Sequence, residues 1–348
     1  MILRNRIEAF SELGEILRNS LSGRNFRHSP ELNRLIETQH LKNPWFTQVN
    51  VRLAVEAISD KLTEENLIKW TSSYPFLNKT AEPVAVGVIM AGNIPLAGFH
   101  DFLSVLISGN KIIAKTSSKD SDLITYISKI LCEINPGFSE RIRLTAGTLS
   151  GFEAVIATGS DNSSRYFEYY FGKFPNIIRK NRNSIAVIEG QETDSELEFL
   201  GNDIFSYFGL GCRNVSKIYI PEGYDLSNMI SRWNRYSELI YHDKYAHNYD
   251  FSKAVYLVKK EKFIDTGFLL LKENQSLSSP VAVLYFEHYN TSDQFKILSE
   301  KQKEKIQCIV GRNYIPFGKA QSPDLWDYAD GTDTMEFLLK KTVRNIVK

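Results

Sequence analysis

An uninterrupted apolar run at residues 84–90, Val-Ala-Val-Gly-Val-Ile-Met, constrains the fold more than any other part of the sequence. A run without polar alternation is typical of a strand that is buried on both faces of a parallel sheet. Apolar residues at helical spacing follow between residues 96 and 106. A buried strand that leads into an amphipathic helix is the repeating unit of a doubly wound α/β sheet, and we predict that fold class.

The same alternation continues along most of the chain after residues 1–80, which are mainly helical and polar by pattern. Further strands are predicted at residues 111–115, 141–145, 152–157, 184–188, 215–220, 253–259, 268–271 and 281–286, and helices at residues 123–134 and 197–208. The length of 348 residues favours two domains, since a domain usually contains about 100–200 residues. We divide the chain into residues 1–183, with N-terminal helices and a first sheet, and residues 184–348, with a second sheet and a C-terminal return segment.

The composition is that of an ordinary globular protein, with 43% apolar and 24% charged residues. A formal net charge of +1 gives no reason to expect a nucleic-acid partner. The N-terminal sequence Met-Ile-Leu-Arg-Asn-Arg lacks the apolar core of a signal peptide. Because no apolar stretch approaches the roughly 18–20 residues of a membrane helix, we expect a soluble chain without a transmembrane segment.

Three cysteines, Cys132, Cys212 and Cys308, are scattered along the sequence and form no Cys-x-x-Cys pair. An odd, scattered set argues against a disulfide framework and against a structural zinc site. We therefore expect no bound metal and a reduced, cytoplasmic setting. Buried structural cysteines are common. We interpret Cys132, on the apolar side of a predicted helix, and Cys308, in a strand-like run, in this way.

The first candidate site follows the strand at residues 84–90, where the sequence Ala-Gly-Asn-Ile-Pro leads into the next helix. The carboxyl ends of strands are where α/β sheets bind ligands. The side-chain amide of Asn93 at this position could donate to a developing oxyanion. The competing interpretation is an ordinary turn, since Gly, Asn and Pro are the usual turn formers.

The second candidate site is the Thr-Gly-Ser sequence at residues 158–160, between a predicted strand and a helix. A helix N-terminus in this position can hold a phosphate, although Ser160 could equally be a simple helix cap. Neither G-x-G-x-x-G nor G-x-x-x-x-G-K-[ST] occurs in the chain. Lys115, at the end of another predicted strand, could reach a cofactor ribose or phosphate, or could be a solvated strand end.

The third candidate site is Gly-Leu-Gly-Cys-Arg-Asn at residues 209–214, between a predicted helix and a strand. Two glycines just before Cys212 allow a sharp backbone turn and leave space for a substrate beside the sulfur. A thiolate is the best side-chain nucleophile for attack on a thioester. The glycines therefore favour a functional interpretation of this cysteine over a structural one.

The order of these segments resembles that of the aldehyde dehydrogenase superfamily. The matching segments are Asn93 to Pro95, Gly109 to Lys115, Thr158 to Ser160 and Gly209 to Cys212. A closer resemblance, to the LuxC-like acyl-CoA reductases that supply fatty aldehyde to bacterial luciferase, is carried by residues 43–47, 248–253 and 325–331. The resemblance implies an aldehyde-dehydrogenase-like fold in which the first domain binds NADP and the second carries the catalytic cysteine.

By this resemblance the chain is an NADPH-dependent acyl-CoA reductase that converts a fatty acyl thioester into an aldehyde. Cys212 is implied to be the nucleophile that forms a thioester intermediate, with Asn93 donating to the oxyanion. Lys115, Gly159 and Ser160 are implied to bind NADPH, and coenzyme A arrives as part of the substrate. The resemblance also implies a homo-oligomer that works beside an acyl-transferring partner enzyme.

Two departures from ordinary aldehyde dehydrogenases narrow the resemblance. Those enzymes carry a Glu-Leu-Gly-Gly-Lys segment whose Glu activates water, whereas residues 179–184 here, Arg-Lys-Asn-Arg-Asn-Ser, contain no carboxylate. Without that base an acyl-enzyme is protected from hydrolysis, which suits exchange with coenzyme A. Those enzymes also hold the nicotinamide ribose with Glu-x-Phe-Gly-Pro, in whose place residues 276–280 read Ser-Leu-Ser-Ser-Pro.

Several further residues keep two interpretations. Residues 116–119, Thr-Ser-Ser-Lys, are small or basic and favour the 2′-phosphate of NADPH over NADH. His242 and His247 are candidate acid–base groups or plain surface residues. Arg179 and Arg182 could pair with cofactor phosphates or lie in a solvated loop.

Two other functions fit the same sequence. An acyl-phosphate or semialdehyde reductase would share the fold and differ in the leaving group, and basic residues around the acyl site would favour it. A non-catalytic scaffold relative would keep the fold without a reactive Cys212, and the missing carboxylate at residues 179–184 makes that alternative conceivable.

Overall fold

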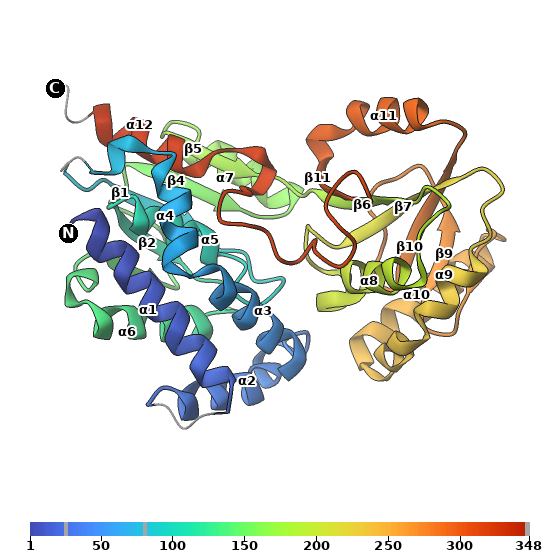
Figure 1. Cartoon of the computed structure of the whole chain (residues 1–348), viewed down its shortest axis with the longest axis horizontal. Coiled ribbons are helices and arrows are strands. Elements are labelled where there is room, and N and C mark those ends of the chain that lie inside the picture. The colour runs from blue at the N-terminus through green and yellow to red at the C-terminus, as the bar shows by residue number, and fades with distance from the viewer. Residues whose placement is uncertain (24–26, 79–81, 345–348) are drawn as a thin grey trace. The chain divides into compact units, whose positions relative to one another are not determined.

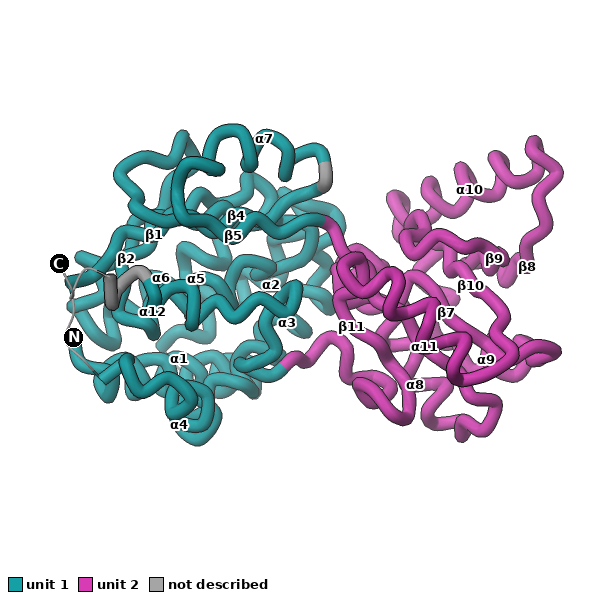
Figure 2. The backbone as a smooth tube through the Cα atoms, turned by 90° about the horizontal axis from the view of Figure 1, so that it is seen from above, with its two compact units in different colours: residues 1–180, 324–348 teal, residues 181–323 magenta. Residues whose placement is uncertain are grey.

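The computed structural model describes residues 1–23, 27–78 and 82–344, which form two compact units (Figure 2). The first unit comprises residues 1–180 together with residues 324–348, and the second comprises residues 181–323. Each unit contains its own, mostly parallel β-sheet with helices packed against it (Figure 1). The α/β fold class that the sequence predicts is therefore confirmed.

Helices precede the first sheet, as the pattern of residues 1–80 predicts. They are α1 Leu3–Leu21, α2 Ser29–Lys42, α3 Gln48–Lys61 and α4 Glu64–Ser72, followed by the 3₁₀ turn η1 Pro75–Asn78. α1 buries Phe10, Leu13 and Leu17, which recur at helical spacing along its core-facing stripe. α3 begins where the Thr47 hydroxyl accepts a hydrogen bond from the Asn50 N–H, which caps the helix.

The first sheet has five parallel strands in the order β3-β2-β1-β4-β5. The strands are β1 Ala85–Ile89, β2 Lys111–Lys115, β3 Ile142–Thr145, β4 Ala154–Thr158 and β5 Asn176–Arg179. The connecting helices are α5 Phe99–Ile107, α6 Asp122–Ile134 with the short η2 Pro136–Phe138, and α7 Asp161–Phe171. The strand order reverses between β1 and β4, and such a switch point is where open α/β sheets bind ligands.

The carboxyl edge of this sheet gathers the predicted residues of the first unit. Because the strands are parallel, the segments after β1, β2 and β4 leave from the same edge. Asn93 follows β1, Lys115 ends β2, and Gly159 and Ser160 follow β4. The topology therefore lines up these four residues along one edge of the sheet.

The C-terminal residues belong to the first unit, which corrects our division of the chain at residues 184–348. After the short 3₁₀ turn η6 Ala329–Gly331, α12 Thr334–Arg344 packs against α5, and it is coloured red in Figure 1. Met335 and Leu338 are buried in the core of the first unit. Their burial provides the physical reason for the return, because it removes apolar surface of α12 from water within the core of the first unit.

The second sheet has six strands in the order β11-β6-β7-β10-β9-β8, all parallel except β8, which pairs antiparallel with β9. The strands are β6 Asn183–Val187, β7 Val215–Pro221, β8 Ile264–Asp265, β9 Leu270–Glu273, β10 Val283–Tyr289 and β11 Ile306–Val310. The helical elements are α8 Asp194–Phe205, η3 Ser206–Gly209, α9 Ser227–Arg232, η4 Asn234–Tyr241, α10 Asp243–Val258, α11 Ser292–Lys301 and η5 Lys303–Lys305.

One predicted strand, at residues 253–259, is wrong, because these residues form the end of α10. The apolar residues that favoured a buried strand are exposed, with 58% of Leu257 and 84% of Val258 accessible. The buried stripe of α10 consists instead of three tyrosines and a serine at helical spacing, Tyr245, Tyr249, Ser252 and Tyr256. A tyrosine can be buried or exposed, because its ring is apolar and its hydroxyl is polar. The sequence pattern therefore does not reveal this stripe. Every helix within the described residues is too short or too polar to span a bilayer.

Candidate active site

The turn after β1 is held tightly against the segment after β2. The Met90 N–H donates to the Lys115 carbonyl at 3.0 Å. A side chain at Gly92 would bring its Cβ within 2.2 Å of the Ser117 hydroxyl oxygen, so only glycine fits there. Asn93 follows directly and is exposed. The packing of its neighbours thus fixes the path of the backbone that presents this amide.

A buried carboxyl group supports the far end of the same turn. Asp120 is only 5% exposed, and its Oδ2 accepts a hydrogen bond from the Leu96 N–H at 2.6 Å. The backbone of Leu96 is left-handed, with φ of 57°, a conformation that is uncommon outside glycine. Burial raises the pKa of Asp120 to about 7. Its other oxygen, Oδ1, is buried and has no hydrogen-bond partner among the described residues.

The segment after β4 shows how Gly159 and Ser160 begin α7. The Ser160 hydroxyl accepts from the Ser163 N–H at 3.3 Å, so the helix-cap interpretation of Ser160 is correct. A Cβ at Gly159 would lie 2.8 Å from the Phe167 ring and 2.9 Å from the Ser163 Cβ. Glycine is therefore required for the strand to approach α7 this closely. Capping and cofactor binding are compatible uses of one helix N-terminus.

The loop that carries Cys212 begins with three consecutive residues in the left-handed region. After α8 ends, φ is 52° at Tyr207, 58° at Phe208 and 76° at Gly209. Left-handed non-glycine residues persist only where the surroundings determine them, and they cluster at functional sites. Cys212 itself is exposed and forms no disulfide within the described chain. The sulfur-bearing residue is thus presented on a strained loop and not packed in the core.

Asn214 holds this loop together from beneath. Its side-chain nitrogen donates to the carbonyls of Ser206 at 2.8 Å and Asp203 at 3.1 Å, and its Oδ1 accepts from the Gly211 N–H at 2.8 Å. Only 2% of Asn214 is exposed. The side chain satisfies backbone groups that the end of α8 leaves without helical partners. This role of Asn214 could not be predicted from the sequence, since a buried polar side chain has no periodic signature.

A second set of contacts joins the loop to residues 318–320. The carboxylate of Asp203 accepts from the N–H groups of Gly318 at 2.6 Å and Ala320 at 2.9 Å. Burial raises the pKa of Asp203 to about 6. Arg213 donates through Nε to the Ala320 carbonyl at 2.5 Å. The residue after the cysteine is therefore anchored at a fixed place within the second unit.

Ser184, at the start of β6, connects the cysteine loop with the sheet. Its hydroxyl donates to the Cys212 carbonyl at 2.9 Å and lies 3.0 Å from the Cys308 sulfur. Cys308 is 8% exposed, in agreement with the structural role that we predicted for it. Ser184 closes the stretch of residues 179–184 that lacks a carboxylate. A hydroxyl engaged in this way is a poor base for activating water.

The two candidate histidines, His242 and His247, lie in different surroundings. The ring centroid of His242 lies 4.4 Å from that of Phe208, and its Nδ1 accepts from the Tyr245 N–H at 3.4 Å to cap α10. The structure thus brings His242 to the loop before Cys212, whereas His247 is exposed on α10. An imidazole that accepts at Nδ1 is a donor only through Nε2.

Both interpretations of Arg179, a partner of cofactor phosphates and a residue of a solvated loop, are wrong. It is 4% exposed and forms an ion pair with Asp101, and it donates to the Thr334 hydroxyl at 2.9 Å. It is therefore a buried tie between β5, α5 and α12, not a phosphate ligand or a solvated loop residue. Arg182 donates to the Ile306 carbonyl at 3.3 Å.

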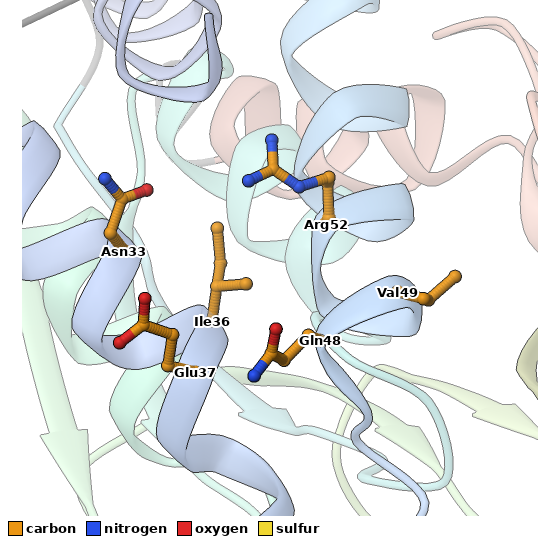
Figure 3. Close-up of a pocket in the computed structure, with 6 residues that line it drawn as sticks. All are labelled: Asn33, Ile36, Glu37, Gln48, Val49 and Arg52. Atoms are coloured by element: carbon orange, nitrogen blue, oxygen red, sulfur yellow. The ribbon is translucent and has the colours of Figure 1, made fainter. Parts of the chain in front are cut away.

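Two hollows lie away from these residues. One of about 250 Å³ lies between α2 and α3, and Figure 3 shows the residues that line it, Asn33, Ile36, Glu37, Gln48, Val49 and Arg52. Another of about 580 Å³ is lined by Glu273, Asn274, Gln275, Glu287 and His288. Among the described residues, no group of three or more His, Cys, Asp or Glu side chains could hold a metal ion.

The structure therefore divides the predicted site residues between the two units. Asn93, Lys115, Gly159 and Ser160 belong to the first unit, and Cys212 belongs to the second. The first unit has Asn93 exposed beside the carboxyl edge of its sheet, and the second has Cys212 exposed on a loop that buried side chains hold in place.

Sequence comparisons connect the chain with one group of proteins, although no family model matches it. It is 23% identical over 192 residues to long-chain acyl-protein thioester reductase 2 of Photobacterium leiognathi, which is 50% of this chain and 40% of that protein. It is 24% identical over 201 residues to long-chain acyl-protein thioester reductase of Aliivibrio fischeri, with 52% and 41% covered. The matched region thus spans less than half of the length of these two relatives.

Structural comparisons identify the fold. Aldehyde dehydrogenase 21 of Physcomitrella patens, solved with the reaction product succinate, matches 98% of this chain and 85% of its own, with a TM-score of 0.64 and 12% identity. An aldehyde dehydrogenase of Mycobacterium tuberculosis complexed with NAD⁺ matches 89% and 73%, with a TM-score of 0.62 and 13% identity. The predicted aldehyde-dehydrogenase-like fold and the predicted resemblance are both confirmed.

Proposed function

We propose that this chain, a relative of the long-chain acyl-protein thioester reductases with the aldehyde dehydrogenase fold, reduces a fatty acyl-CoA to the aldehyde with NADPH. Cys212 is the nucleophile in this proposal. The observation that carries it is an exposed cysteine on a loop of three left-handed residues, clamped by the buried Asn214. A strained loop that is over-determined by its surroundings is typical of a functional site.

In the first step the Cys212 thiolate attacks the acyl carbonyl carbon, and the bond from that carbon to the sulfur of coenzyme A breaks. Coenzyme A leaves as a thiolate, and the acyl group remains on Cys212 as a thioester. The Asn93 amide and the backbone N–H of Cys212 donate to the oxyanion that forms during attack. Such a donor typically contributes about 10²–10³ in rate.

A thiol needs assistance to ionise, since its ordinary pKa is about 8.5. His242, which contacts Phe208 in the loop before Cys212, is our candidate for this assistance. Its Nδ1 accepts from the Tyr245 N–H, so the neutral ring carries its proton on Nε2. It assists by donating a hydrogen bond from Nε2 to the thiolate, not by taking the proton of the thiol. His247, which is exposed on α10, is a weaker candidate.

The carboxyl edge of the first sheet suits a dinucleotide. Lys115 ends β2 at this edge, and Gly159 and Ser160 lead into the N-terminus of α7. The small or basic residues 116–119 leave room for a 2′-phosphate and carry no acidic residue against it. When bound there, NADPH supplies the hydride that converts the acyl group into an aldehyde. We therefore assign Lys115, Gly159 and Ser160 to NADPH binding.

The same structure favours reduction over hydrolysis of the acyl-enzyme. Residues 179–184 provide no carboxylate, and the Ser184 hydroxyl is engaged with the Cys212 carbonyl and the Cys308 sulfur. Without a carboxylate in this segment to activate water, the thioester reacts slowly with water and persists until it is reduced. The proposal includes a cytoplasmic homo-oligomer that receives acyl groups from a transferring partner.

The test follows NADPH absorbance with a series of acyl-CoAs of increasing chain length. Wild-type protein should oxidise NADPH only when acyl-CoA is present, and Cys212→Ala should abolish the oxidation. Cys308→Ala is the matched control and should retain activity. Parallel reactions with an acyl phosphate and with an acylated carrier protein identify the leaving group. Folded protein that turns over none of these donors would remove the proposal in favour of a non-catalytic role.

A further inference from the structure

We infer that Asp120 is a positioning residue that fixes the Asn93 amide by holding the Leu96 N–H at the end of the same turn. The inference rests on the proposed function, in which Asn93 donates to the oxyanion. Asp120 touches neither substrate nor cofactor in this account. It acts through the backbone of residues 93–96.

The contact is well formed and enclosed. The distance from the Leu96 nitrogen to Asp120 Oδ2 is 2.6 Å, and Asp120 is 5% exposed. Burial of a carboxyl group is unfavourable unless it is hydrogen-bonded. Its second oxygen has no partner among the described residues, so the Leu96 contact is the interaction that this side chain supplies. An apolar residue in this place could not accept a hydrogen bond from the Leu96 N–H.

The conformation of Leu96 gives that hydrogen bond its importance. A left-handed leucine is unfavourable, yet Leu96 is held at φ 57° with its side chain buried in the core of the first unit. The Leu96 carbonyl in turn accepts from the Phe99 N–H, at the start of α5, at 2.9 Å. Without the carboxylate, the buried Leu96 N–H loses its acceptor and the strained backbone is free to relax. Asn93 lies three residues away on that backbone.

The segment that carries Asp120 is itself rigid. Its own N–H donates to the Ser117 carbonyl at 3.1 Å, and the Lys119 N–H donates to the Ser117 hydroxyl at 3.2 Å. The same Ser117 side chain packs against Gly92, the residue before Asn93. The turn is thus held at both ends, by Ser117 before Asn93 and by Asp120 after it. A rigid support of this kind lets the position of Asp120 determine the position of the amide.

Asp122 is a matched control two residues further on. It is also an aspartate, but it pairs with Lys42 at 2.6 Å and accepts from Gln39 at 3.3 Å. Its contacts therefore join α6 to α2, away from the turn. Asp122→Asn removes a carboxylate charge near Asp120 without altering the acceptor of the Leu96 N–H.

The experiment compares four variants in the acyl-CoA assay. Asp120→Leu keeps the side-chain size and removes the acceptor, Asp120→Ala removes both, and Asp120→Asn keeps a carbonyl oxygen in place. We expect kcat to fall about tenfold or more in Asp120→Leu and Asp120→Ala, part of the loss expected for the oxyanion donor itself. Asp120→Asn and Asp122→Asn should stay within about threefold of wild type. The dissociation constant of NADPH should be unchanged in all four.

The decisive measurement repeats Asp120→Leu in an Asn93→Ala background. If Asp120 acts through Asn93, adding Asp120→Leu to Asn93→Ala should change kcat by less than about twofold, because the effects of coupled residues do not add. Full additivity, or a loss that appears in NADPH affinity, overturns the inference. Should Asp120→Leu not fold, the same comparison is made with Asp120→Ala. Should neither variant fold, Asp120 is needed for the fold itself and not only for the position of Asn93, and the inference is overturned too.

The outcome separates the two proposals. Turnover by wild type that Asn93→Ala reduces, together with a wild-type kcat in Asp120→Leu, removes the inference and leaves the function standing. No acyl-dependent turnover by the folded wild type removes both.

Discussion

The side-chain amide of Asn214 donates to the Ser206 carbonyl at 2.8 Å, across the base of the loop that presents Cys212. We predict that Asn214→Ala lowers the free energy of unfolding by about 2–4 kcal/mol, since several buried backbone groups lose their partner and each such loss costs about 1–3 kcal/mol. Urea unfolding measures the change. Asn228→Ala, at an exposed position on α9, is the control and should stay within about 0.5 kcal/mol. Equal stability of the two variants would contradict the clamp.

The three cysteines should differ in reactivity. Cys212 is exposed, Cys132 is half-buried and Cys308 is buried. A short pulse of iodoacetamide on folded protein, followed by peptide mass spectrometry, should label Cys212 first and Cys308 last. Ser184→Ala is a useful comparison, because it removes the hydroxyl that bridges the Cys212 carbonyl and the Cys308 sulfur. Labelling of Cys308 before Cys212 would show that the cysteine loop is not presented as described.

Asp120 should make stability depend on pH in a definite direction. Burial raises the pKa of Asp120 in the folded state from 3.8 to about 7, so the folded protein binds this proton more tightly than the unfolded chain does. Its contribution is most favourable below about pH 4 and is lost as the pH rises to about 7. Asp120→Asn has no charge to bury. Relative to wild type, its free energy of unfolding should rise between pH 4.5 and pH 8, by at most about 4 kcal/mol.

The same measurement on Asp122→Asn provides the control. The ion pair with Lys42 lowers the pKa of Asp122, so removing this carboxylate brings no gain at high pH. A difference between wild type and Asp120→Asn that stays constant from pH 4.5 to pH 8 would argue against a buried, proton-binding Asp120.

The ion pair between Arg179 and Asp101 should be essential to the first unit. Both groups are buried, and removing one partner leaves an uncompensated charge, at a cost of about 3–5 kcal/mol. Arg179→Met should therefore lower the free energy of unfolding by about this amount. Lys180→Met breaks an exposed pair with Glu168 one residue later, and such pairs contribute about 0–1 kcal/mol. Guanidinium unfolding of both variants tests the contrast.

Much of the fold could be predicted because it depends on local pattern. The apolar run at residues 84–90 becomes β1, buried on both faces, and the sequence before Cys212 forms the predicted helix-to-strand loop. Such features are visible since burial on a regular element leaves a periodic trace. The strand predicted at residues 253–259 failed because the buried stripe of α10 is made mostly of tyrosines while its aliphatic residues face solvent.

The supports of the candidate site could not be predicted in the same way. Asp120, Asn214 and Asp203 act through hydrogen bonds to backbone groups that are distant in sequence or lie within a turn. Aspartate and asparagine usually lie at the surface, so their residue type does not indicate burial. Only the three-dimensional structure shows that these three side chains are buried. Arg179 was misread for the same reason, because its partner Asp101 lies on another element.

The return of residues 324–344 to the first unit imposes an order on folding during synthesis. The second unit, residues 181–323, is one uninterrupted stretch, and the ribosome finishes it while the first unit still lacks α12. Met335 and Leu338 must then fill their places in a core most of whose other members were made much earlier. The unit that begins first on the ribosome is therefore the one that is completed last.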